Sequence, residues 1–61
     1  MLRTIQIFIN DQYYKDMTIT VNDNGAYSLG PIMSLLNQDK EAGLFEPFGS
    51  APHSIRVQLH L

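Results

Sequence analysis

Three segments of the chain alternate between apolar and polar residues, with Phe8 as the exception, and this alternation limits the possible folds more than any other feature. The alternating apolar residues are Ile5, Ile7 and Ile9, then Met17, Ile19 and Val21, and finally Ile55, Val57, Leu59 and Leu61. A period of two residues places alternate side chains on one face of a strand. We therefore expect strands at residues 3–9, 16–22 and 54–61, each with one apolar face.

The first two segments are close enough in sequence to form an antiparallel hairpin. Their apolar faces coincide only if directly opposed residues have numbers with an even sum, which requires a connection with an odd number of residues. A three-residue turn at residues 10–12 meets this requirement, and so does a longer loop through Tyr13, Tyr14 and Lys15. A two-residue turn at residues 10–11 would send the apolar faces to opposite sides of the sheet.

Residues 22–25, Asn-Asp-Asn-Gly, form the strongest turn signal of the chain. Asn-Gly readily adopts the two positive φ angles of a type I′ hairpin turn. Residues 26–29 are then either a short third strand that pairs back on residues 18–22 or an irregular approach to a helix. We favour the strand.

A short amphipathic helix is expected after Gly30-Pro31, because proline suits the first turn of a helix. The residues of its apolar face are Ile32, Leu35 and Leu36, with Met33 at the margin. Gly43 can close the helix with a left-handed residue, although Asn37 offers an earlier end. Residues 44–53 contain two prolines and a glycine, which predicts an irregular segment.

This order of elements predicts one α+β domain over residues 1–61, a small ββ(β)αβ fold. One amphipathic helix would pack on a three- or four-stranded mixed sheet. The sheet is expected to be mixed because a helix between two strands commonly forms a crossover, so that the last strand can pair in parallel with an earlier one.

Residues 5–12, Ile-Gln-Ile-Phe-Ile-Asn-Asp-Gln, followed by a hairpin and a helix, resemble the opening of β-grasp domains, which include ubiquitin-like and sulfur-carrier proteins. The resemblance implies a β-grasp-like order of elements. The carriers act through a C-terminal Gly-Gly, whereas residues 58–61 here are Gln-Leu-His-Leu. The resemblance therefore implies no carrier or conjugation function.

Charge and composition argue against several partners and cofactors. Four Lys and Arg residues against six Asp and Glu residues give a formal charge of −2, and the four cations are dispersed, so we expect no nucleic-acid partner. The absence of cysteine excludes disulfides and thiolate zinc sites. No stretch approaches the length of a membrane span, and the first residues lack a signal peptide's apolar core. We expect a soluble, cytoplasmic protein.

No residue pattern predicts catalysis, a metal or a cofactor. The two histidines, His53 and His60, have no further ligands at metal-site spacing and are expected at the surface. Asp39 and Glu41 lie two residues apart on the expected helix and point in different directions, so we expect them to be solvated charges rather than paired acids. The protein is therefore not expected to be an enzyme.

The aromatic residues are the stronger candidates for a contact surface. Phe45 and Phe48 either cap the core beneath the long loop or contact a partner. Tyr13 and Tyr14 are adjacent, so a strand that includes both would turn one of them outward. The residues proposed for interaction are Tyr13, Tyr14, Tyr27, Phe45, Phe48, Arg56 and His60.

The leading hypothesis is a non-catalytic protein-interaction module, a small regulator or inhibitor that acts as a homodimer or on a larger partner. It rests on the missing reaction motif, the small core and the unpaired edges of a small sheet. Acidic phage or mobile-element proteins that block a host factor belong to the same class. The alternatives are a small-ligand or oligonucleotide-binding domain that stacks on the aromatic rings, and an enzyme that combines His60, Arg56 and a carboxylate at an oligomer interface.

Overall fold

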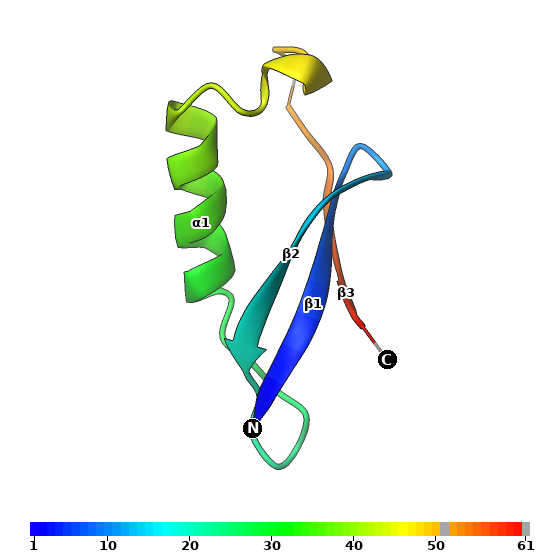
Figure 1. Cartoon of the computed structure of the whole chain (residues 1–61), viewed down its shortest axis with the longest axis vertical. Coiled ribbons are helices and arrows are strands. Elements are labelled where there is room, and N and C mark those ends of the chain that lie inside the picture. The colour runs from blue at the N-terminus through cyan, green and yellow to red at the C-terminus, as the bar shows by residue number, and fades with distance from the viewer. Residues whose placement is uncertain (51, 61) are drawn as a thin grey trace.

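The chain folds into one α-helix packed on a three-stranded antiparallel sheet, as a computed structural model of residues 1–50 and 52–60 shows (Figure 1). The elements in chain order are β1 (Leu2–Ile9), β2 (Gln12–Thr20), α1 (Gly30–Glu41), a 3₁₀ turn (Glu46–Phe48) and β3 (Ile55–Leu59). The strand order is β2-β1-β3. The predicted α+β class and the three alternating strands are confirmed, although β2 begins four residues earlier and ends two residues earlier than predicted. Leu61, predicted to extend the last strand, lies outside the described residues.

The sheet is not mixed, because β3 pairs antiparallel with β1. Both outer strands are antiparallel to β1 and therefore run in the same direction, joined through α1 as the crossover rule anticipates. The prediction of a parallel pair is wrong because β1 lies between the two strands. It takes up the hydrogen bonds that a parallel β2-β3 pair would have formed.

The predicted strand at residues 26–29 is also absent, and the segment is an irregular approach to α1. The Asn22 side chain explains this, because its Oδ1 accepts hydrogen bonds from the backbone N–H groups of Asn24 and Ala26, both at 2.9 Å. In residues 22–25 only Gly25 has a positive φ, of 82°. The segment is therefore an asparagine-centred turn and not the type I′ hairpin turn that its sequence indicates.

The type I′ turn lies instead between β1 and β2, at Asn10 and Asp11. Their φ angles are 51° and 64°, which asparagine and aspartate tolerate better than other non-glycine residues. The prediction of an odd-numbered connection is wrong, because this connection has the two residues that the parity argument rejected. Asn10 also ties the turn to the start of β3: its N–H donates to the Ser54 carbonyl at 2.9 Å, and its Oδ1 accepts from the Ser54 N–H at 3.0 Å.

A β-bulge at Tyr14 reconciles the short turn with the apolar pattern. Phe8 pairs with Tyr13, but Ile7 pairs with Lys15, so Tyr14 is an extra residue on β2. The added residue shifts the register by one, and beyond it Ile5 faces Met17 on the same side of the sheet. The apolar faces coincide as predicted, by a bulge rather than by an odd loop.

The helix α1 ends just before Gly43, as predicted from the sequence. Gly43 has a φ of 82°, its N–H donates to the Lys40 carbonyl at 3.1 Å, and the Leu44 N–H donates to the Asp39 carbonyl at 2.9 Å. These two bonds form a Schellman motif, which reverses the chain at the end of α1.

The core lies between α1 and one face of the sheet, called the inner face below. Its buried residues are Ile5, Ile7, Ile9, Ile19, Val21, Ile32, Leu36 and Phe45. Phe45 and the partly buried Phe48 fill the end of the core near the 3₁₀ turn, as one reading of the sequence expected. Within residues 1–50 and 52–60, no helix has the length and apolarity needed to cross a membrane.

Candidate interaction site at the third strand

The helix is fixed to the β2 side of the sheet by Asp39. Its Oδ2 accepts a hydrogen bond from the Tyr14 hydroxyl at 2.6 Å and lies 2.7 Å from the Lys15 Nζ. The side chain of Asp39 is only 14% exposed, so the expectation of a solvated helix charge is wrong for this residue. Glu41, by contrast, is exposed.

The bulge makes this double contact possible. Adjacent residues of a regular strand point to opposite faces, yet both Tyr14 and Lys15 reach Asp39 above the inner face. Lys15 lies opposite the buried Ile7, and Tyr14 turns inward because it is the extra residue. Its ring packs edge-on against Phe45, with centroids 5.6 Å apart.

The contacts at Asp39 shift two pKa values. Lys15 and then the Tyr14 hydroxyl stabilise the carboxylate, and they lower the pKa of Asp39 below its ordinary value. Burial, followed by the hydrogen bond to the Asp39 carboxylate, raises the pKa of Tyr14 to about 12. Both shifts favour the pair in which Asp39 is charged and Tyr14 is neutral.

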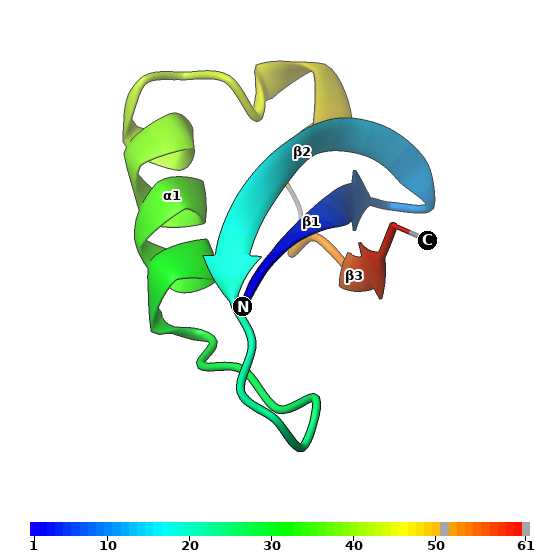
Figure 2. The same ribbon diagram turned by 60° about the horizontal axis from the view of Figure 1, so that its bottom comes forward.

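With the helix held over β2 and β1, β3 is left largely uncovered. Figure 2 shows α1 on the β2 side, with β3 across β1 from it, in agreement with Figure 1. The three inner-face isoleucines of β1 are fully buried. On β3, Ile55 and Leu59 point to the same face, but they are 42% and 37% exposed.

An apolar groove of about 390 Å³ lies between α1 and β3. Its apolar wall residues are Leu29, Ile32, Met33, Leu36, Phe45, Ile55 and Val57. Leu29 and Met33 stay more than half exposed along its rim. A surface of this kind, apolar and open to water, is typical of interaction sites.

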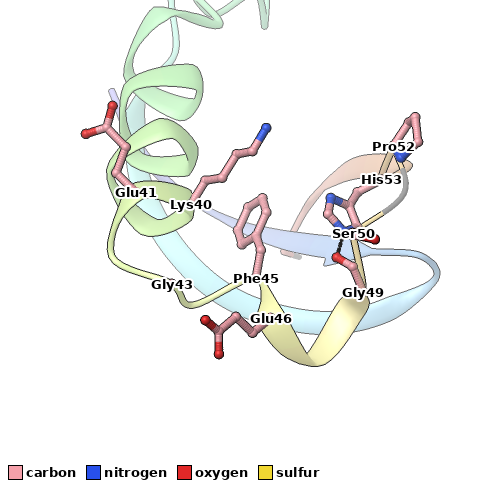
Figure 3. Close-up of a pocket in the computed structure, with 9 residues that line it drawn as sticks. All are labelled: Lys40, Glu41, Gly43, Phe45, Glu46, Gly49, Ser50, Pro52 and His53. Atoms are coloured by element: carbon pink, nitrogen blue, oxygen red, sulfur yellow. Dashed lines mark hydrogen bonds between the residues drawn. The ribbon is translucent and has the colours of Figure 1, made fainter.

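The groove continues into a more polar hollow at the end of α1, shown in Figure 3. Phe45 stands between Lys40 and His53 in this view. The His53 Nε2 lies 2.8 Å from the Gly49 carbonyl oxygen, and the His53 ring packs edge-on against Phe45. Across the described ranges 1–50 and 52–60, no three His, Asp or Glu side chains gather closely enough to hold a metal ion.

The outer edge of β3 presents backbone groups beside its apolar side chains. The Asn10 N–H donates to Ser54 and the His60 N–H donates to Thr4, so even-numbered residues of this strand form the bonds to β1. The N–H and C=O groups of the odd-numbered residues therefore point away from β1. These residues are Ile55, Val57 and Leu59, whose side chains also lie on the inner face.

The other sheet edge, along β2, has a different character. Val21 and Met1 are bonded to each other, so the even-numbered residues of β2 direct their backbone groups outward. Asp16, Thr18 and Thr20 are these residues, and all three are polar and exposed. With the bulge at Tyr14, this is how proteins protect an edge against strand addition. On the β3 edge, the corresponding residues Ile55, Val57 and Leu59 are apolar.

The structure separates the residues that the sequence proposed for interaction. Tyr14, Tyr27, Phe45 and Phe48 belong to the core or pack against it. Tyr13, Arg56 and His60 are exposed.

The exposed residues Tyr13 and Arg56 flank Phe8 on the outer face of the sheet. The guanidinium carbon of Arg56 lies 4.1 Å from the Phe8 ring centroid, and Tyr13 packs edge-on against the same ring. Sequence reasoning did not select Ile55, Val57 and Leu59, although their alternation was visible, because the pattern does not say which strand the helix covers.

Comparison with protein-family models, with curated proteins and with solved structures finds no match for this chain. The resemblance to β-grasp domains therefore stays one of element order.

Proposed function

We propose that the protein is a non-catalytic interaction module that binds an extended protein segment by strand addition at β3. The observation that carries this proposal is the coincidence, on Ile55, Val57 and Leu59, of outward backbone groups with partly exposed apolar side chains. An added strand would obtain hydrogen bonds from the backbone and apolar contacts from the groove.

This binding mode requires an extended segment with apolar residues at alternate positions. Its alternate side chains would continue the inner face next to Ile55 and Leu59, while the others would face water beside Arg56. By pairing with an extended segment of another protein, such a module keeps that segment from its other contacts and acts as a small regulator or inhibitor. Direct strand pairing, rather than stacking on rings, is favoured because Phe45 is buried and Tyr14 is packed against it.

Amide chemical shifts test the proposal. A capped peptide of alternating threonine and valine is added in large excess to dilute, isotopically labelled protein, so that the peptide outcompetes any self-association. We expect the shifts to change at Ile55, Val57 and Leu59. The β2 edge is the internal control, and Asp16 and Thr18 should not respond. Changes confined to the β2 edge, or none at either edge, would contradict strand addition at β3.

A further inference from the structure

We infer that the strand added at β3 is β3 of a second copy of this chain, so that two molecules share a six-stranded antiparallel sheet. This inference rests on the proposed function and names its partner. In the shared sheet a two-fold axis passes between the Val57 residues of the two copies and stands perpendicular to the sheet. Antiparallel pairing about this axis keeps both helices on the same side of the shared sheet. The two apolar faces therefore also lie on one side.

The backbone of β3 is compatible with this symmetry. When Val57 lies opposite Val57 of the second copy, Ile55 lies opposite Leu59 of that copy, and Leu59 lies opposite its Ile55. All these residues are odd-numbered, and they carry the N–H and C=O groups that point away from β1. The outward groups therefore meet each other as hydrogen-bonded pairs.

The inner-face side chains match across the axis as well. Ile55 and Leu59, each more than a third exposed in the single chain, cover one another. The groove between α1 and β3 would then meet its symmetry copy along a continuous apolar seam. A 61-residue chain has a small core, typically worth no more than about 3–5 kcal/mol, and burial of this seam would add to it.

Charge selects the register on the outer face. With Val57 on the axis, Arg56 lies opposite the neutral Gln58 of the second copy, and Ser54 lies opposite His60. Within one chain the Arg56 Nη1 already donates to the Gln58 Oε1 at 2.8 Å, so these two side chains are suited to pair. A register centred on Arg56 would place two guanidinium groups opposite each other, which is destabilising.

Sedimentation equilibrium of the full chain measures the association directly. We expect a reversible monomer-dimer equilibrium and no larger species, because the pairing about a two-fold axis is closed. Val57→Lys places two ammonium groups on the axis and should abolish the dimer. Thr18→Lys adds the same charge at the middle of the β2 edge and should leave the dimer intact.

Gln58 provides a second test at an exposed position where folding is not at risk. Gln58→Glu creates two symmetric ion pairs with Arg56 across the seam and should tighten the dimer roughly 2- to 30-fold, while Gln58→Lys should weaken it by a similar factor. Both effects should diminish at high salt. A register centred on Gln58 itself would make the glutamate variant weaker, and that result would overturn the register proposed here.

These outcomes distinguish a failure of the inferred dimer from a failure of the proposed strand addition. A monomer at every concentration whose β3 amides still respond to the threonine-valine peptide would overturn the second copy as partner and leave strand addition standing. A dimer that survives Val57→Lys with the fold intact would overturn the inference, because the interface would lie elsewhere. A monomer whose β3 edge ignores the peptide would remove both proposals.

Discussion

The Tyr14 hydroxyl donates a 2.6 Å hydrogen bond to Asp39 Oδ2, which joins the bulge of β2 to the last turn of α1. The same oxygen lies 2.7 Å from the Lys15 Nζ. One carboxylate thus receives two donors from adjacent residues of the sheet. These contacts determine where the helix is anchored.

Asp39→Asn should destabilise the protein by about 1–2 kcal/mol, because the amide keeps the shape of the side chain but loses the ion pair with Lys15. Urea denaturation followed by circular dichroism measures the change. Glu41→Gln removes the same charge from an exposed position of the same helix and should change the stability by less than about 0.5 kcal/mol. Equal effects of the two substitutions would refute the special role of Asp39.

The wild-type protein should lose stability in acid through Asp39. Because the pKa of Asp39 is lowered in the folded state, the unfolded chain binds the proton more readily. The contribution is complete above the ordinary carboxyl pKa of about 4 and is lost as the pH falls through the lower pKa of the folded state. In urea titrations across this range, the stability difference between wild type and Asp39→Asn should shrink towards low pH. A difference independent of pH would contradict the ion pair.

In alkali the corresponding loss should come from Tyr14. Its pKa is raised to about 12, from an ordinary value of 10.0, so the folded state holds the proton more tightly than the unfolded chain. The stabilisation is complete below about pH 10 and is lost as the pH rises towards 12. Ultraviolet absorbance of tyrosinate should show a late step that Tyr14→Phe removes. If the step persists in this variant, another tyrosine is responsible.

The two adjacent tyrosines should differ sharply on truncation. Tyr14→Ala removes a ring that packs against Phe45 and Phe48 and should cost about 2–4 kcal/mol, enough to unfold much of a small domain. Tyr13→Ala removes a ring that is 55% exposed and should cost less than about 1 kcal/mol. Thermal unfolding of the two variants compares them, and similar losses would argue against the bulge.

Gly43 should resist substitution because of its backbone and not because of its surroundings. Its φ is 82°, and an added Cβ would meet only the carboxyl group of Glu46, with Oε1 at an ordinary 3.6 Å. Gly43→Ala should therefore cost about 1–2 kcal/mol, and Gly43→Asn should cost less because asparagine tolerates the left-handed conformation. Chemical denaturation of both variants tests this. An asparagine variant as unstable as the alanine variant would indicate a steric cause.

Local patterns were sufficient to predict the three strands and the helix of this fold, but they also predicted a strand at residues 26–29 that is absent. The alternation at Ile5, Ile7 and Ile9 identifies a strand with one apolar face, and Gly43 marks the end of the helix, because both depend on neighbouring residues alone. The apolar face of β3 was also visible in the sequence. Its exposure was not, since that depends on where α1 docks.

Long-range contacts account for what the sequence did not reveal. In the sequence, Asp39 cannot be told from other acidic residues on a helix surface. Its partners Tyr14 and Lys15 lie 25 and 24 positions away, and only the fold brings them to it. The bulge was missed although the sequence contained a signal for it. Asn10-Asp11 suits a two-residue turn, and in this sequence such a turn brings the apolar residues of both strands to one face only if one residue of β2 stays unpaired. At Asn22, a side-chain oxygen accepts a hydrogen bond from the Ala26 N–H, which in a hairpin would have donated to a backbone carbonyl.

The inserted residue at Tyr14 has a consequence for the opposite border of the molecule. Without residue 14, the two-residue turn and the apolar faces would agree in an ordinary hairpin. The insertion is thus not required for pairing, and what it adds is the Tyr14 side chain, which joins Lys15 in anchoring α1 above β2. A helix anchored there cannot also shield β3. One extra residue in the second strand therefore determines which side of the protein is left available for contact.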